Sequence, residues 1–345
     1  MYNNWFKDSE LFAQEYSDKS LIGYQIQKDS DSSIPIGTQV VIFGYNTDTA
    51  DAIRRKLYDC TYNFSNLQMI DLGNLRNKEK SFTIQILNEL NESGVNVIVL
   101  GPDPDFHQSQ LTAVKNRQNI AYVDKTGSQL FSEDNKKYLF ENKYINKIKL
   151  IGYQAHLFHL SKLVDKKLNH SLSLGDIRNN MRDAEPALRD VSIINFMLEC
   201  IRYSEIPGVK NTTPSGFTSE EACQLMRYFG LNTLTNFLAI YGYNPKYDFH
   251  DQGVSMISQL IWYYMEGLDQ KKLDKPDSKE NMTQYLVDLS DYELSLNFMK
   301  SDYSGKWWVE IPKEDEEPYL LPCSFMDYKI ACNNEMPKRI MKEFE

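Results

Sequence analysis

Short apolar runs alternate with helix-like patterns along most of the chain. The runs are rich in β-branched residues, and the stretches between them repeat apolar positions every three to four residues. Strands that alternate with helices predict a parallel sheet covered by helices on both faces. The expected strands are 38–45, 66–73, 95–101, 119–127, 147–154, 191–198 and 234–243, and the expected helices are 46–60, 81–94, 108–118, 220–230 and 255–268.

The helix expected near residue 220 has the clearest end signals. Thr218 is the predicted N-cap, Glu221 completes a capping box three residues later, and Gly230 marks the C-terminal end. The charged stretch 271–281 contains a proline and no apolar period, which predicts a linker. The expected organisation is an N-terminal segment 1–37, an α/β domain 38–270, the linker 271–281 and a C-terminal extension 282–345.

The tail alternates apolar and polar residues. This pattern predicts antiparallel strands that turn at Ser304-Gly305 and pack on the main domain. Trp307 and Trp308 form a candidate binding surface, although a Trp pair in a strand more often has one buried ring and one half-buried ring. The acidic run 314–317 is most simply an exposed loop.

Composition narrows the classes of partner. The 345 residues are 41% hydrophobic and 12% aromatic, as in ordinary globular proteins. A net charge of -10 argues against nucleic acid or an anionic membrane as a partner. The chain has neither a signal-like start nor an apolar run of roughly 18 residues, so we expect a cytoplasmic protein without a membrane span. Its five scattered cysteines predict neither a disulfide framework nor a structural zinc site.

Candidate chemistry is expected where the strands end, because ligands of open α/β sheets bind beyond the carboxyl ends of the strands. The run "GPDPDF" follows one expected strand and places Asp103 and Asp105 on either side of Pro104. The chain lacks the glycine-rich nucleotide motifs, the nucleophile elbow and the HExxH zinc motif. His156 and His159 would share one helical face, but no nearby carboxylate supports a metal site, so a structural role is favoured.

The order of strand ends between roughly residues 38 and 270 resembles that of the arginase, agmatinase and formimidoylglutamase family of ureohydrolases, and the resemblance is strongest in two segments. Residues 204–231 resemble its Pro-Gly turn and the Pro-x-Gly helix start that follows. Residues 239–268 resemble its closing strand, its Asn-Pro-x-x-Asp loop and its last helix, and "CNNEMPKR" resembles the branch with a C-terminal extension. The resemblance implies a three-layer αβα fold with a parallel sheet of about eight strands, and assembly as a trimer or hexamer.

The resemblance also implies where a metal centre would lie. Family members hydrolyse a guanidino or formimino carbon with a hydroxide that bridges two manganese ions, held by several carboxylates and imidazoles. This chain departs from that ligand pattern. The ligand positions fall on Pro104, Asp124, Thr126, Ser128, Met197 and Glu199, and the acidic residue near the substrate falls on Gly242. Two remaining carboxylates cannot neutralise and orient two divalent ions.

Two functions from different classes follow. The favoured hypothesis is a non-catalytic protein without a cofactor, which binds a protein partner, a second copy or a small amino-acid-like ligand. The alternative is a hydrolase of a formimino or guanidino compound with a rearranged Mn²⁺ centre. A shifted loop would then supply Asp103 and Asp105, joined by Asp124, Glu199 and, in a single weak magnesium, calcium or manganese site, Glu205. Exposed or capping carboxylates are the simpler interpretation.

Overall fold

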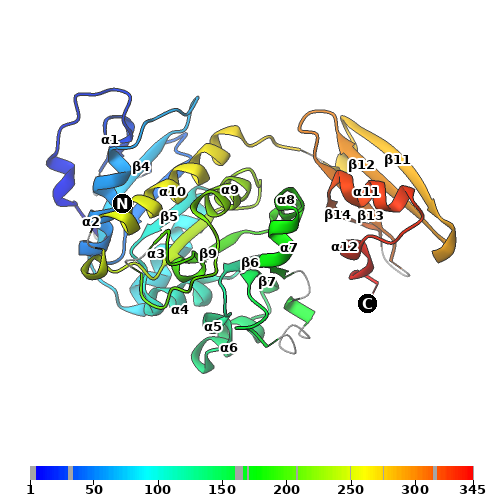
Figure 1. Ribbon diagram of the computed structural model, residues 1–345. Coiled ribbons are helices and arrows are strands. Elements are labelled where there is room, and N and C mark those ends of the chain that lie inside the picture. Colours follow the sequence, from blue (N-terminus) through cyan, green and yellow to red (C-terminus); the bar gives the residue numbers. More distant parts are fainter. Residues whose placement is uncertain are drawn as a thin grey trace.

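The computed structural model describes residues 5–29, 34–159, 166–168, 171–206, 209–248, 250–274, 276–313 and 317–344. It contains two sheets, a large one in the main body and a small one near the C-terminus (Figure 1). Of the acidic loop expected at 314–317, all but Glu317 lies outside the described residues. None of the described helices is long and apolar enough to cross a membrane.

The large sheet has the strand order β1-β4-β3-β5-β10-β9-β6-β7-β8, with β2 also paired to β4. Among the described strands of this sheet only β1 runs antiparallel to its neighbour, so the predicted parallel sheet is confirmed. Its strands are β1 (Phe6–Lys7), β2 (Gln27–Lys28), β3 (Val40–Gly44), β4 (Met69–Leu75), β5 (Asn96–Leu100), β6 (Gln118–Val123), β7 (Ile145–Tyr153), β8 (Leu172–Ser173), β9 (Ile193–Met197) and β10 (Phe237–Tyr241).

Helices cover both faces of this sheet, which completes the expected three layers. Every residue of the central strands β3, β5, β9 and β10 is buried, because apolar helix faces pack on both sides. One face carries α1 (Ile22–Gln25), α2 (Thr47–Tyr58), α7 (Leu174–Asn179), α8 (Met181–Leu188), α9 (Ser219–Gly230) and α10 (Gln252–Gln270). The other carries α3 (Lys80–Glu92), α4 (Pro104–Ala113), α5 (Ser128–Phe131) and α6 (Glu133–Phe140).

Helix α9 begins with the predicted capping box. The Thr218 side chain accepts from the Glu221 N–H at 3.1 Å, and the Glu221 carboxylate accepts from the Thr218 N–H at 2.8 Å. Gly230 is the last helical residue but has a different role from the predicted cap. A Cβ at Gly230 would lie 2.2 Å from the carbonyl oxygen of Tyr264, so this glycine allows α9 and α10 to cross closely.

The helix expected at 108–118 begins earlier, at Pro104. The Asp103 carboxylate accepts from the Phe106 N–H at 3.0 Å and caps α4. Proline is favoured at the first helical position, since its missing N–H has no partner there anyway. The run "GPDPDF" is therefore a short turn followed by the first turn of a helix, not a long loop.

A short loop of the kind noted in the sequence connects β10 to α10. Asn244 caps a 3₁₀ turn by accepting from the Lys246 N–H at 3.0 Å. The Asp248 carboxylate accepts from the N–H groups of Gly253 and Val254 at 3.0 and 2.9 Å. The Asn-Pro-x-x-Asp motif thus fixes the start of the last helix of the main body.

The C-terminal unit is an antiparallel sheet with two helices beside α7 and α8 (Figure 1). Gly305, at φ 76°, lies in the predicted turn. The extent of each domain stays a prediction, although α10 ends and the first strand of this unit begins where the linker was expected. The elements are β11 (Met282–Leu289), β12 (Leu294–Ser301), β13 (Trp307–Ile311), β14 (Tyr319–Cys323), α11 (Phe325–Cys332) and α12 (Lys338–Met341).

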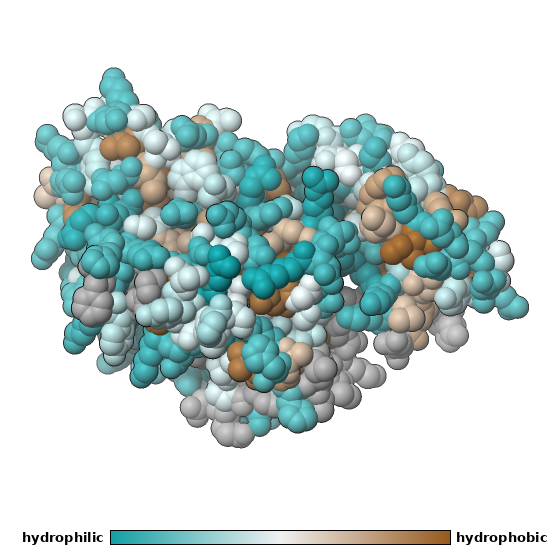
Figure 2. All heavy atoms as spheres, in the orientation of Figure 1, coloured by the Kyte–Doolittle hydropathy of each residue, from teal (hydrophilic) through white to brown (hydrophobic). Residues whose placement is uncertain are grey.

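Both tryptophans of β13 are buried, whereas one half-buried ring was expected. Trp307 is 8% exposed and stacks on Tyr285 and Tyr328, and Trp308 is 6% exposed. The Arg189 guanidinium lies 4.7 Å from the centre of the Trp308 ring and donates to the Trp307 carbonyl at 2.7 Å. The Trp308 ring and the Trp307 carbonyl therefore join the unit to Arg189 at the end of α8. Little of either ring reaches the mainly hydrophilic surface (Figure 2).

Candidate functional site at the carboxyl ends of the strands

The adjacent strands β6 and β9 bring Asp124, Lys125 and Glu199 to one edge of the sheet. Val123 pairs with Phe196 in parallel register, so the residues that follow each strand emerge side by side. Glu199 lies in a 3₁₀ turn (Leu198–Cys200), and its Oε2 is 3.8 Å from Nζ of Lys125. The structure thus joins two predicted carboxylates around a lysine that the sequence analysis had not considered.

Lys125 is only 3% exposed and lies between partners from distant parts of the chain. Its ammonium also donates a short hydrogen bond to the carbonyl oxygen of Asn211, 86 positions away. A buried ammonium needs such partners, because losing its hydration costs several kcal/mol. Its charge lowers the pKa of both Asp124 and Glu199, although burial outweighs this effect.

Burial raises the pKa of both remaining carboxyls. For Asp124, which is fully buried, desolvation is opposed mainly by hydrogen bonds from the Thr126 N–H at 3.0 Å and hydroxyl at 3.4 Å. For Glu199, desolvation is the largest cause of the raised pKa, and the negative charge of Asp124 raises this pKa further. Oδ2 of Asp124 has no hydrogen-bond partner within the part of the chain that the structure describes.

The segment after residue 208, which resembles a ureohydrolase motif, closes over this edge of the sheet. The Ser215 hydroxyl donates to the Gln154 side chain at 2.9 Å, and that side chain donates back to the Ser215 carbonyl at 3.2 Å. At Gly216 a Cβ would lie 2.6 Å from backbone atoms of Cys200 and Arg202. The Pro-x-Gly motif therefore lets this segment lie directly on the strand ends.

The other family positions offer no ligand. Pro104 is exposed in the first turn of α4, and Ser128 is exposed at the start of α5. Met197 is buried in the apolar layer beneath the sheet. Gly242 is exposed with φ +96°, and the space where its Cβ would lie contains only atoms of Leu198 at 3.9 Å. A side chain at Gly242 would strain the backbone.

The further carboxylates considered for a rearranged centre lie elsewhere. Asp103 caps α4 and Asp105 is exposed. Glu205 accepts from Arg202 at 2.6 Å and from the Ser219 hydroxyl at 2.7 Å, and these bonds lower its pKa. Among the described residues no group of three or more His, Cys, Asp or Glu side chains could hold a metal ion. The residues present do not fit a two-manganese centre.

The histidines also differ from expectation. His156 and His159 are exposed in a turn after β7 and do not lie on a helix. His107, not considered in the sequence analysis, is buried beneath the sheet with its Nε2 2.7 Å from the Tyr122 hydroxyl. Burial lowers the pKa of His107 to about 4, against a smaller opposing effect of Asn135. In the sequence, the available signal for His107 is its position one helical turn after Pro104, where α4 begins.

Comparison with known proteins identifies the fold. No family model and no curated protein matches the chain. Solved structures do match, and the three described below share 14 or 15% identity with the chain. Formimidoylglutamase from Bacillus subtilis has a TM-score of 0.63 at 14% identity, over 76% of this chain and 96% of that one. Trypanosoma cruzi formiminoglutamase with Mn²⁺ gives 0.61 at 14%, over 74% and 100%.

Agmatine ureohydrolase of Thermoplasma volcanium gives a TM-score of 0.54 at 15% identity, over 73% of this chain and 94% of that one. At such identities the likeness concerns the fold alone. The chain has an arginase-type α/β fold, as the sequence resemblance predicted, together with a small antiparallel sheet at its C-terminus.

Proposed function

We propose that this chain is a non-catalytic protein on a ureohydrolase fold, which works by binding a protein or a small ligand and needs no metal cofactor. The observation that carries the proposal is the ammonium of Lys125, 3.8 Å from Glu199 at the strand ends where an enzyme of this type requires metal ligands. The loss of both imidazole positions, to Pro104 and Thr126, supports it.

The electrostatic reason is direct. A divalent cation held by Asp124 and Glu199 would lie beside the buried charge of Lys125. At about 4 Å and an effective dielectric constant of about 20, that repulsion is on the order of 8 kcal/mol. Lys125 would have to leave its hydrogen bond to Asn211 before an ion could enter. The ammonium therefore offsets part of the negative charge of the remaining carboxylates in place of a metal.

The alternative remains a hydrolase of a formimino or guanidino compound that uses Mn²⁺. It is favoured by the Mn²⁺-containing T. cruzi formiminoglutamase among the structural neighbours and by the surviving Asp124–Glu199 pair. Assembly as a trimer or hexamer and a cytoplasmic location belong to the proposal as family expectations, and a second copy is one candidate partner.

Manganese content decides between the two functions. The purified chain is incubated with excess Mn²⁺, dialysed and subjected to elemental analysis, with B. subtilis formimidoylglutamase treated in parallel as the positive control. We expect well under one manganese per chain, and no Mn²⁺-dependent hydrolysis of formiminoglutamate, arginine or agmatine. Two ions per chain, or hydrolysis that depends on Mn²⁺, would establish the alternative.

A further inference from the structure

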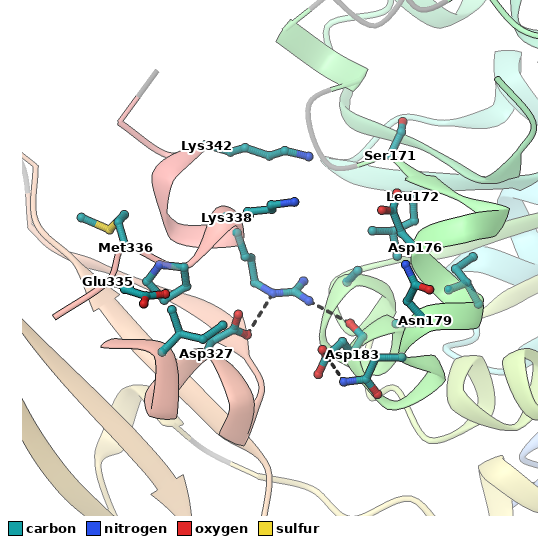
Figure 3. Close-up of a pocket in the computed structure, with 17 residues that line it drawn as sticks. Ser171, Leu172, Asp176, Asn179, Asp183, Asp327, Glu335, Met336, Lys338 and Lys342 are labelled. Atoms are coloured by element: carbon teal, nitrogen blue, oxygen red, sulfur yellow. Dashed lines mark hydrogen bonds and ion pairs between the residues drawn. The ribbon is translucent and has the colours of Figure 1, made fainter. Parts of the chain in front are cut away.

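A cleft of about 490 Å³ separates the C-terminal unit from helices α7 and α8 (Figure 3). It lies apart from the strand-end site and shares none of its residues. Arg339 joins the two walls: it pairs with Asp327 of its own unit at 3.3 Å and donates to the Asp183 carbonyl at 2.8 Å. The cleft thus lies at an interface between two parts of the chain that Arg339 holds together. Small-molecule sites commonly occur at such interfaces.

Among the described residues, the main-body wall carries only negative charges, whereas the opposite wall carries three cationic and two acidic side chains and has a net positive charge. Lys338 and Lys342 extend from the C-terminal unit across the gap, toward Ser171 and Asp176 on the main body (Figure 3). Asp183 lies on the same wall as Asp176, and its carboxylate accepts from Asn180 at 2.5 Å. A purely anionic ligand would meet the aspartates, and a purely cationic one would meet the lysines.

Apolar side chains line both walls of the cleft as well. Ile177, Ala184 and Ala187 line the main-body wall, and Ile330 and Met336 line the opposite wall. Apolar lining with a few convergent polar groups is typical of ligand pockets, whose volumes run from about 300 to 1,000 Å³. The space is large for a single amino acid and suits two linked residues with aliphatic side chains.

We propose that this cleft binds a zwitterionic ligand of dipeptide size. The ligand carboxylate meets Lys338 and Lys342, its ammonium meets Asp176 and Asp183, and its aliphatic side chains pack between the walls. Such a ligand bridges the two units and stabilises their contact. This inference does not depend on whether the strand-end site is inactive.

The test uses the full chain and the dipeptide Leu-Leu, with thermal shift and titration calorimetry at low ionic strength. N-acetyl-Leu-Leu, which lacks the ammonium, and Leu-Leu amide, which lacks the carboxylate, are the matched ligands. We expect Leu-Leu to raise the unfolding temperature, since binding to the native state stabilises it. Each analogue should bind at least tenfold more weakly. No binding of Leu-Leu at millimolar concentration, or equal binding of all three, overturns the proposal.

Variants locate the site. The double variant Lys338→Met and Lys342→Met should weaken Leu-Leu binding at least tenfold, and Asp176→Asn, which can still accept the capping hydrogen bond from Ser173, should also weaken it. Lys329→Met is the control, because Lys329 is exposed on α11 and does not line the cleft. Unchanged affinity in the double variant, with native circular dichroism, rules out this cleft. The ligand series needs no variant to fold.

Discussion

Two ion pairs at the large sheet, each with a buried cation, differ in how completely their charges are satisfied. Arg54 is fully buried and bonds Asp71 through two nitrogens, at 2.8 and 3.0 Å. It also donates to Asn74 at 2.7 Å and to a backbone carbonyl at 2.6 Å. Lys125 is almost as buried, yet its contact with Glu199 is a single one at 3.8 Å, beside one backbone carbonyl.

The difference separates a structural cluster from the candidate functional site. Around Arg54 the planar guanidinium matches the carboxylate of Asp71, and Tyr58 donates a further bond to that carboxylate at 2.9 Å. At the strand ends, Asp124 keeps an oxygen without a partner among the described residues, and burial holds its pKa above the ordinary value. A cluster with unmet charge contributes little to the stability of a fold and is typical of functional sites.

The largest effect is expected where the charges are fully paired. Asp71→Ala removes the two-nitrogen partner of the buried Arg54 charge and leaves Asp51, at 2.8 Å, as its remaining carboxylate among the described residues. The change should lower the free energy of unfolding by about 3 kcal/mol or more. Urea unfolding measures the loss, with Asp291→Ala, which removes an exposed carboxylate, as the control. A loss below about 1 kcal/mol would mean that the Arg54 cluster is no more structural than the strand-end one.

His107 extends the comparison to the groups beneath the strand ends. Its pKa of about 4 in the folded chain is below the ordinary 6.5, so the unfolded chain binds the extra proton between these values. Stability from this group is present above pH 6.5 and is lost as the pH falls to 4, by about 3 kcal/mol in total.

Urea midpoints measured from pH 7 to pH 4 test this prediction. His107→Gln keeps a polar group opposite Tyr122 but cannot titrate, so its acid-induced loss should be smaller than that of the wild type by this amount. Parallel pH profiles for the two proteins would contradict the buried, neutral state of His107.

The fold is largely predictable from the sequence because the signals that mark its strands and helices are local. Continuous β-branched runs and an S/T-x-x-E capping box need only a few neighbouring residues to be recognised. The same local rules, applied fully, would have found the start of α4, where Asp103 precedes Pro104. They would also have found α7, whose capping box joins Ser173 to Asp176 instead of to a glutamate. The predicted helix at 108–118 starts four residues late because Pro104 and the aspartates beside it are also typical of loops, and α7 has no counterpart among the predicted helices.

The candidate site is less predictable for a physical reason. Alignment with family motifs located Asp124 and Glu199, but the group that decides their chemistry is Lys125, whose partner Asn211 is remote in sequence. Nor does a sequence state that Glu205 is engaged by Arg202 and Ser219. Which charges meet depends on how a loop closes over the strand ends, and no periodicity encodes that.

Removal of Lys125 tests its role as a substitute for a metal. Lys125→Met leaves Asp124 and Glu199 without their cation, and should lower stability on the order of 2 kcal/mol at pH 8. The two carboxylates should then gain weak affinity for one divalent cation, which titration calorimetry with Mn²⁺ detects. Lys115→Met, at an exposed position, is the control for both measurements. A variant as stable and as indifferent to Mn²⁺ as the control would show that the ammonium neutralises nothing.

The smallest predicted effect is a gain in the free energy of unfolding, whereas the substitutions above lower it. Because the pKa of Asp124 is raised in the folded chain, the folded state holds its proton more tightly than the unfolded state, and stability falls as the pH rises through the folded pKa. Asp124→Asn keeps an oxygen that can accept from Thr126 and removes the buried charge. It should stabilise the chain at pH 8 by on the order of 1 kcal/mol, which is the size of the effect of an ordinary substitution, and should give no gain near pH 4.

Urea midpoints of Asp124→Asn and the wild type at the two pH values measure this difference. Destabilisation at pH 8 would mean that the attraction between Asp124 and Lys125 outweighs the cost of burial, and the strand-end cluster would then resemble the Arg54 cluster after all.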